Sequence, residues 1–270
     1  MRPGSGAVLA LSLLAGLAGA GMARAEEAPQ GSAQGSTAPQ ASPQPLPQAC
    51  EVPAYLLNTD NVLPKVTEAV KSGRPLNVLV VGSRSSTIAS SADSAYPAKL
   101  LAALKQRLPS TPIDLSVELQ GGKTAEETDV ILVKLVEAKK PTLVIWQTGT
   151  VDAMRSVDPD DFRTAVGDGV AALQNAGADV VLINLQYSPR TETMISAPPY
   201  LDIMRVVAQE KSVPLFDRFG IMRHWNDAGD FDLFSAVHGP DMAKRVHACI
   251  GRALSKFIFD AARLDPAQQN

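Results

Sequence analysis

The stretch LNVLVVGSRSST, residues 76–87, decides the fold. Its first part, Leu76–Val81, is aliphatic except for one asparagine, which is typical of a strand buried on both faces of a parallel sheet. Its second part, Gly82–Thr87, is rich in small polar residues and predicts a tight turn. Polar side chains are therefore expected at the carboxyl end of this strand.

Four more stretches rich in Val, Leu and Ile predict further buried strands: Ile113–Glu118, Leu143–Gln147, Val180–Leu185 and Val213–Phe216. Stretches with apolar residues at three- and four-residue spacing lie around them and predict helices: Val62–Ser72, Ala98–Leu108, Glu126–Glu137, Phe162–Ala176, Tyr200–Glu210 and Met242–Phe259. Alternating strands and helices predict a three-layer α/β/α domain with a doubly wound, five-stranded parallel sheet. Ligands of such domains bind at the carboxyl ends of the strands.

The N-terminal residues differ from the rest of the chain. An apolar run, Ala7–Met22, precedes Ala23-Arg24-Ala25, and this order predicts a secretory signal peptide over residues 1–25. A membrane anchor is the alternative, but the run barely reaches the ~18 apolar residues of a spanning helix. Residues 26–49 are rich in Pro, Gln, Ser and Ala and predict a disordered linker. We expect a folded domain over 50–262, a flexible tail over 263–270, and a periplasmic or secreted protein.

Composition narrows the classes of partner. The chain has 270 residues and a net charge of -3, without a long basic run, which argues against nucleic-acid binding. No spacing of His, Cys, Asp and Glu suggests a metal site, and no cofactor is expected. His224 and His247 are interpreted as structural residues.

The only two cysteines, Cys50 and Cys249, predict a disulfide in an exported protein, although two separate buried thiols remain the alternative.

Four loops fall where the active site of an α/β domain is expected: Gly82–Thr87, Gln120–Ala125, Gly149–Asp152 and Phe234–Met242. In order and spacing they resemble the four sequence blocks of the SGNH/GDSL hydrolases, and the resemblance covers Cys50 to about Leu254. Tyr96-Pro97 and Gln186–Pro189 resemble an exported bacterial branch of that family. The resemblance implies a flavodoxin-like sheet and a serine ester hydrolase, with a Ser nucleophile, oxyanion donors and a His base oriented by an Asp.

The first block departs from the family pattern. The nucleophile position holds Arg84 when the blocks are aligned without a gap, whereas a one-residue insertion aligned on Thr87 selects Ser85. Ser83 is the alternative nucleophile. A third interpretation is that these serines only form a turn that caps the next helix.

The second and third blocks concern the oxyanion. Gly122 corresponds to the family's oxyanion glycine, but Val151 replaces the asparagine whose amide donates to the oxyanion. Loss of one such donor typically costs ~3 kcal/mol of transition-state stabilisation. Asp152 is retained, and in the family this residue mainly holds the loops together. We also consider Arg84, Asp152 and Arg190 as ligand contacts, since each lies in a loop on the expected ligand side.

The fourth block exchanges two residues. When Met242 and Cys249 anchor the alignment, His238 falls on the family's Asp position and Asp241 on its His position. A carboxylate with an unperturbed pKa of ~4 is a weak proton acceptor compared with an imidazole. When His238 is instead aligned as the base, Ser235 stands where the family has its Asp.

Two hypotheses follow. In the first, the protein hydrolyses an acyl or acetyl ester of envelope carbohydrate or lipid: Ser85 attacks, Gly122 helps to hold the oxyanion, and His238 is the base, oriented by Asp241 or Asp232. In the second, the fold binds a ligand or partner without turnover, and Arg84 at the nucleophile position favours an anionic ligand. An envelope scaffold is a third class. In each, no transmembrane segment remains after signal cleavage.

Overall fold

The computed structural model describes residues 50–89, 91–234 and 239–264. The predicted signal peptide, the linker and most of the predicted tail lie outside this part of the chain. The described residues contain one sheet of five parallel strands in the order β2-β1-β3-β4-β5. Its strands are β1 Leu76–Gly82, β2 Ile113–Leu119, β3 Leu143–Gln147, β4 Asp179–Ile183 and β5 Leu215–Phe216. The predicted five-stranded parallel sheet is confirmed.

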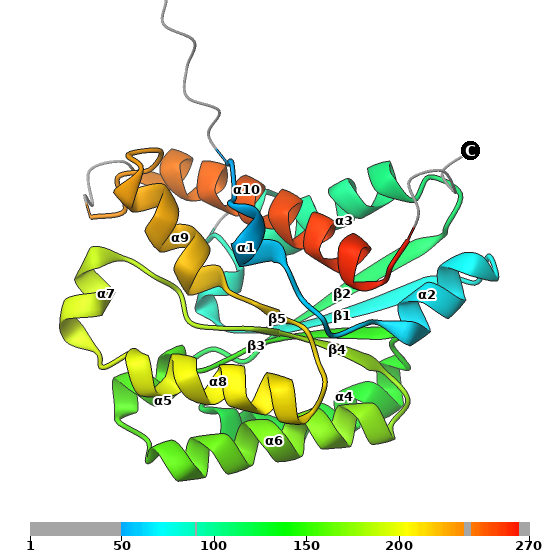
Figure 1. Cartoon of the computed structure of the whole chain (residues 1–270), viewed down its shortest axis with the longest axis horizontal. Helices are drawn as coiled ribbons and strands as arrows, with labels where there is room; N and C mark the ends of the chain where they lie inside the picture. The colour runs from blue at the N-terminus through cyan, green and yellow to red at the C-terminus, as the bar shows by residue number, and fades with distance from the viewer. Residues whose placement is uncertain (1–49, 90, 235–238, 265–270) are drawn as a thin grey trace, which may run out of the picture. The chain divides into compact units, whose positions relative to one another are not determined.

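Helices cover both faces of the sheet (Figure 1). One layer contains α1 Ala54–Leu57, α3 Tyr96–Arg107, α9 Arg218–Asp227 and α10 Gly239–Ala261. The other contains α4 Ala125–Lys139, α5 Thr150–Arg155, α6 Pro159–Asn175 and α8 Pro198–Glu210. The remaining helices are α2 Pro64–Lys71 and α7 Pro189–Met194, and two short 3-10 turns are η1 Arg84–Ser86 and η2 Ala92–Ser94. This arrangement confirms the predicted three-layer, doubly wound domain.

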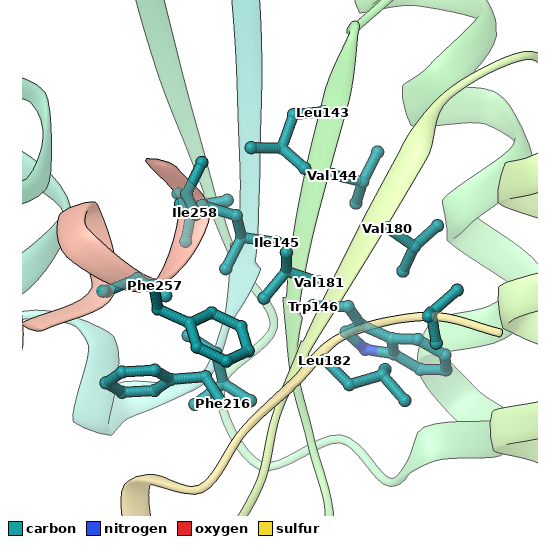
Figure 2. Close-up of a cluster of buried hydrophobic side chains, with 14 of the residues drawn as sticks. Leu143, Val144, Ile145, Trp146, Val180, Val181, Leu182, Phe216, Phe257 and Ile258 are labelled. Carbon is teal, nitrogen blue, oxygen red and sulfur yellow. The ribbon is translucent and has the colours of Figure 1, made fainter. Parts of the chain in front are cut away.

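Side chains of β3, β4 and β5 contribute much of the core (Figure 2). Phe216 of β5 meets Phe257 of α10 edge to face, with ring centroids 5.5 Å apart. On the other face, Trp146 of β3 is fully buried against α6. A Cβ added to Gly169 would lie 2.6 Å from the Trp146 ring, so only glycine lets the helix pack this closely. The core thus fixes β3, whose last residue becomes central to the site.

Two strand predictions need correction. β2 is an edge strand, and Val117 and Leu119 are 40% and 44% exposed, because helices do not cover both of its faces. β5 begins at Leu215 rather than Val213, because the Val213 N–H bonds back to the Ala208 carbonyl at the end of α8. The helix α9 was not among the predicted helices.

A disulfide joins Cys50 to Cys249, with the two Cα atoms 5.1 Å apart. It ties the first described residue to α10 and confirms the predicted pairing. Within the described part of the chain, no helix combines the length and apolar character needed to cross a bilayer.

Candidate active site

The turn after β1 is held by its own serines. The Ser83 hydroxyl oxygen accepts from the Ser85 N–H at 3.3 Å, and the Ser86 hydroxyl oxygen accepts from the Ser83 N–H at 3.3 Å. This reciprocal pair is a capping box at the start of η1. The serines thus cap the 3-10 turn η1 rather than the next helix, α3, and the Ser85 hydroxyl lies 3.1 Å from the capping Ser83 oxygen.

Gln147, the last residue of β3, connects these serines. Its Nε2 donates to Ser83 Oγ at 2.8 Å and to Ser85 Oγ at 3.0 Å. Its Oε1 accepts from the Ser86 hydroxyl at 2.6 Å and lies 3.4 Å from the Tyr96 hydroxyl. Because Oε1 faces hydroxyl donors, the amide can only turn its N–H groups toward Ser83 and Ser85.

Arg218, the first residue of α9, contacts both Gln147 and Ser85. Its side chain is only 2% exposed, and Nη1 donates to Gln147 Oε1 at 3.0 Å and to Ser85 Oγ at 3.2 Å. Its Nε and Nη2 are buried without a partner, and no ion pair with Arg218 occurs among the described residues. Burial lowers the pKa of Arg218 to about 10, so the guanidinium is still a cation at neutral pH.

A small cavity opens beside this cluster, at the carboxyl ends of β1 and β3. It is lined by Ser83, Gln120, Lys123, Gln147 and Val151, among others, and none of its lining residues is acidic. Its volume of about 10 Å³ is room for about one water molecule. Val151 thus presents an apolar side chain to the space where the resemblance implies an amide donor.

Two arginines, Arg155 and Arg84, contact the second loop. Gly122 has φ +79°, a left-handed conformation that suits glycine, and its carbonyl accepts from Arg155 Nη2 at 2.8 Å. The side chain of Arg84 passes over the neighbouring Gly121, where an added Cβ would lie 3.3 Å from Arg84 Cγ. Arg84 itself is exposed, so its side chain lies at the surface over the second loop.

Asp152 ties the second and third loops together. It is 1% exposed, and its Oδ1 accepts from the Ala125 N–H at the start of α4 at 2.8 Å, while Oδ2 is buried without a partner. Burial raises the pKa of Asp152, although three backbone N–H groups partly offset this effect. The geometry matches the loop-holding role that the resemblance implies, and it places Asp152 away from solvent.

The fourth block does not reach the serines through its described residues. Asp241 is exposed in the first turn of α10, and its Oδ1 accepts from Lys244 Nζ at 3.0 Å. His238 and Ser235 lie outside the described residues. Arg190 is exposed on α7, the helix that follows the loop after β4.

His247 is a structural residue, as expected. Its Nδ1 accepts from the Tyr96 N–H at 2.9 Å, which anchors the start of α3 to α10. Burial, and secondarily the charge of Arg218, lowers the pKa of His247 to about 4. The imidazole is therefore neutral at pH 7, and its Nδ1 is already engaged.

Sequence reasoning missed Gln147, Arg218 and Tyr96. The sequence did hold a signal for Gln147, because it is the polar last residue of an otherwise apolar strand, at the end where ligands are expected to bind. Arg218 follows a short strand in the same way, but it lies in a helix that was not predicted. Only the pairing of β3 with β1 brings the amide to the serine turn.

The family assignment agrees with this geometry. The model of the non-GDSL lipase-like family matches residues 49–264. The chain belongs to the non-GDSL lipase-like family. The resemblance to SGNH/GDSL hydrolases is thereby confirmed. None of the curated proteins matches the sequence.

Several solved structures share the fold of this non-GDSL lipase-like chain. A two-domain esterase active on acetylated mannans is 15% identical over 75% of this chain and 55% of its own, with a TM-score of 0.62. The acetyl xylan esterase AlAXEase is 17% identical over 69% of this chain and 99% of its own, with a TM-score of 0.54. The psychrotrophic esterase EstA from Pseudoalteromonas sp. is 19% identical over 68% and 97%, with a TM-score of 0.52. At these identities the likeness establishes the fold.

Proposed function

We propose that the protein is a serine ester hydrolase, exported to the periplasm or beyond, that cleaves short acyl esters such as acetyl groups on envelope carbohydrate or lipid. One observation carries the proposal: the Ser85 hydroxyl is half-buried at the carboxyl end of β1, between the Gln147 amide and the Arg218 guanidinium. The resemblance to the family implies a nucleophile at this edge of the sheet. The cavity beside Ser83 has room for about one water molecule and therefore offers no space for a long acyl chain.

In this proposal Ser85 Oγ attacks the ester carbonyl and its proton passes to His238. The second loop, with Gly122, provides backbone N–H groups for the oxyanion. Asp241 and Asp232 remain candidates for orienting His238. Of the solved structures with this fold, one is an esterase active on acetylated mannans and another is an acetyl xylan esterase, which supports a carbohydrate ester as the substrate class.

A second function, binding without turnover, is favoured by a different observation. Arg84 stands at the ungapped nucleophile position and its side chain lies over Gly121, next to the oxyanion glycine. Val151 provides no side-chain donor on the opposite side. A site so arranged would hold an anionic ligand more readily than it would hydrolyse a neutral ester.

The deciding experiment is labelling with a fluorophosphonate probe, read by intact-protein mass spectrometry. The esterase proposal expects one probe per wild-type chain, no label on Ser85→Ala, and retained label on Ser110→Ala, an exposed serine far from the turn in sequence. His238→Ala should slow labelling by about a hundredfold or more, as expected for loss of a general base.

Ser83→Ala separates the two serines. If Ser83 is only a cap, the variant should label more slowly but still to completion, because capping interactions contribute ~1 kcal/mol. If Ser83→Ala abolishes labelling and Ser85→Ala does not, the nucleophile is Ser83. Absence of label and of aryl-acetate cleavage in the wild type would leave the binding function.

A further inference from the structure

The described part of the chain places a buried cation directly behind the proposed nucleophile. Arg218 Nη1 lies 3.2 Å from Ser85 Oγ and 3.0 Å from Gln147 Oε1. We propose that Arg218 is a catalytic residue that stabilises negative charge on the Ser85 oxygen during attack. This inference rests on the proposed esterase function and adds to it a residue that the sequence resemblance does not supply.

The first argument is the absence of a counter-charge. An arginine buried for structural reasons normally pairs with a carboxylate, because an unpaired buried charge is destabilising. Arg218 bonds to neutral oxygens, and two of its three nitrogens have no partner. Its positive charge is therefore not neutralised within the described structure, and Ser85 Oγ lies 3.2 Å from its Nη1.

The second argument is the direction of the hydrogen bonds. Ser85 Oγ receives donors from both Arg218 Nη1 and Gln147 Nε2. Donors strengthen as their acceptor gains negative charge, so both contacts favour the serine oxygen as its proton leaves. Arg218 also holds Gln147 Oε1, which keeps the amide N–H groups on the serines.

The reaction step balances as follows. The Oγ–H bond of Ser85 breaks and its proton goes to His238, as in the proposed function. The electron pair of that bond forms the new bond to the ester carbon, while the carbonyl π pair moves to the carbonyl oxygen. Arg218 neither gains nor loses a proton in this step. It stays bonded to Oγ and stabilises the charge that Oγ carries as its proton leaves, before that charge passes to the carbonyl oxygen.

The charge of Arg218 persists over the working pH range. The titratable groups that face it are Tyr96 from α3 and His247 from α10. Burial raises the pKa of Tyr96, and the pKa of His247 lies at about 4. Both are neutral between about pH 5 and 9, so Arg218 stays charged and its effect on Ser85 is constant there.

The experiment compares fluorophosphonate labelling rates from about pH 5 to 9 for the wild type, Arg218→Met, Arg218→Lys and Arg223→Met. Arg223 is an exposed arginine on the same helix and is the matched control. We expect Arg218→Met to label at least about a hundredfold more slowly, as for loss of one charge-stabilising donor. The apparent pKa of its labelling rate should lie above that of the wild type. Arg218→Lys should restore part of the rate, and Arg223→Met should match the wild type.

Thermal unfolding monitored by circular dichroism accompanies each variant. Equal labelling of Arg218→Met and the wild type would overturn the inference while the esterase function stands. A second outcome would also overturn the inference: Arg218→Met labels slowly and melts far below Arg223→Met, while Arg218→Lys restores the melting temperature but not the labelling rate. Arg218 would then have a structural role. A wild type that does not label at all would overturn both proposals.

Discussion

The two ends of the sheet differ in whether their buried charged groups have hydrogen-bond partners. At the amino end, Asp179 of β4 is buried, and its carboxylate accepts from the Val66 N–H at 2.9 Å and from the Lys65 N–H. These are free N–H groups of the first turn of α2, whose own N-cap residue, Leu63, makes no side-chain bond. A strand residue thus caps a helix, and both groups are satisfied.

At the carboxyl end the buried charges are not satisfied. Of the four buried side-chain atoms without a partner in the described residues, three belong to Asp152 and Arg218. Unpaired buried groups are destabilising, so a fold keeps them where something other than stability is gained. The comparison indicates that the amino end is built for stability and that the carboxyl end is built for chemistry.

The largest expected effect comes from adding a donor at the carboxyl end. Val151→Asn introduces an amide at a position that lines the same cavity as Ser83, where the family has its asparagine. If the protein is an esterase, aryl-acetate turnover should rise by about a hundred- to a thousandfold. Val130→Asn, at an exposed position of α4, is the control. An unchanged turnover would mean that missing donors do not limit this site.

The fold was predictable from the sequence because its strands are buried. Leu143–Gln147 is apolar up to its last residue because helices cover both faces of the strand, and the structure has the same bounds. The exposed edge strand β2 and the short strand β5 were predicted less well. An edge strand and a two-residue strand have a weaker hydrophobic pattern in the sequence.

The site was predictable only in part. Ser83 and Ser85 follow a strand directly, so their loop could be located from the sequence. Gln147 and Arg218 reach them across 62 and 133 positions of chain, through strand pairing and through the entry of α9. No local pattern records such a contact. His238 lies outside the described residues, so its role as the base stays a prediction.

A smaller effect is expected at the amino end. Asp179→Ala removes the acceptor of two helix N–H groups and leaves them buried, which should lower the free energy of unfolding by about 1–3 kcal/mol. Urea denaturation monitored by circular dichroism measures this loss. Asp114→Ala, at an exposed position of β2, should change stability little. Fluorophosphonate labelling of the folded Asp179→Ala protein should stay at the wild-type rate, and a fall in labelling would break the division between the two ends.

The smallest effect concerns the pH dependence that Asp152 contributes. Because burial raises its pKa in the folded state, this carboxyl group binds its proton more tightly folded than unfolded. Its contribution to stability is therefore fully present below the unfolded pKa of ~4 and is lost as pH rises through the folded pKa. Asp152→Asn keeps an oxygen for the Ala125 N–H but cannot ionise. We expect urea midpoints of Asp152→Asn to fall less than those of the wild type as pH rises from about 4 to 7. Asp179, whose pKa is also raised by burial, remains in both proteins, so part of the slope should persist in the variant. If both proteins show the same slope, the unpaired Asp152 oxygen does not destabilise the fold, and the carboxyl end is less strained than its contacts indicate.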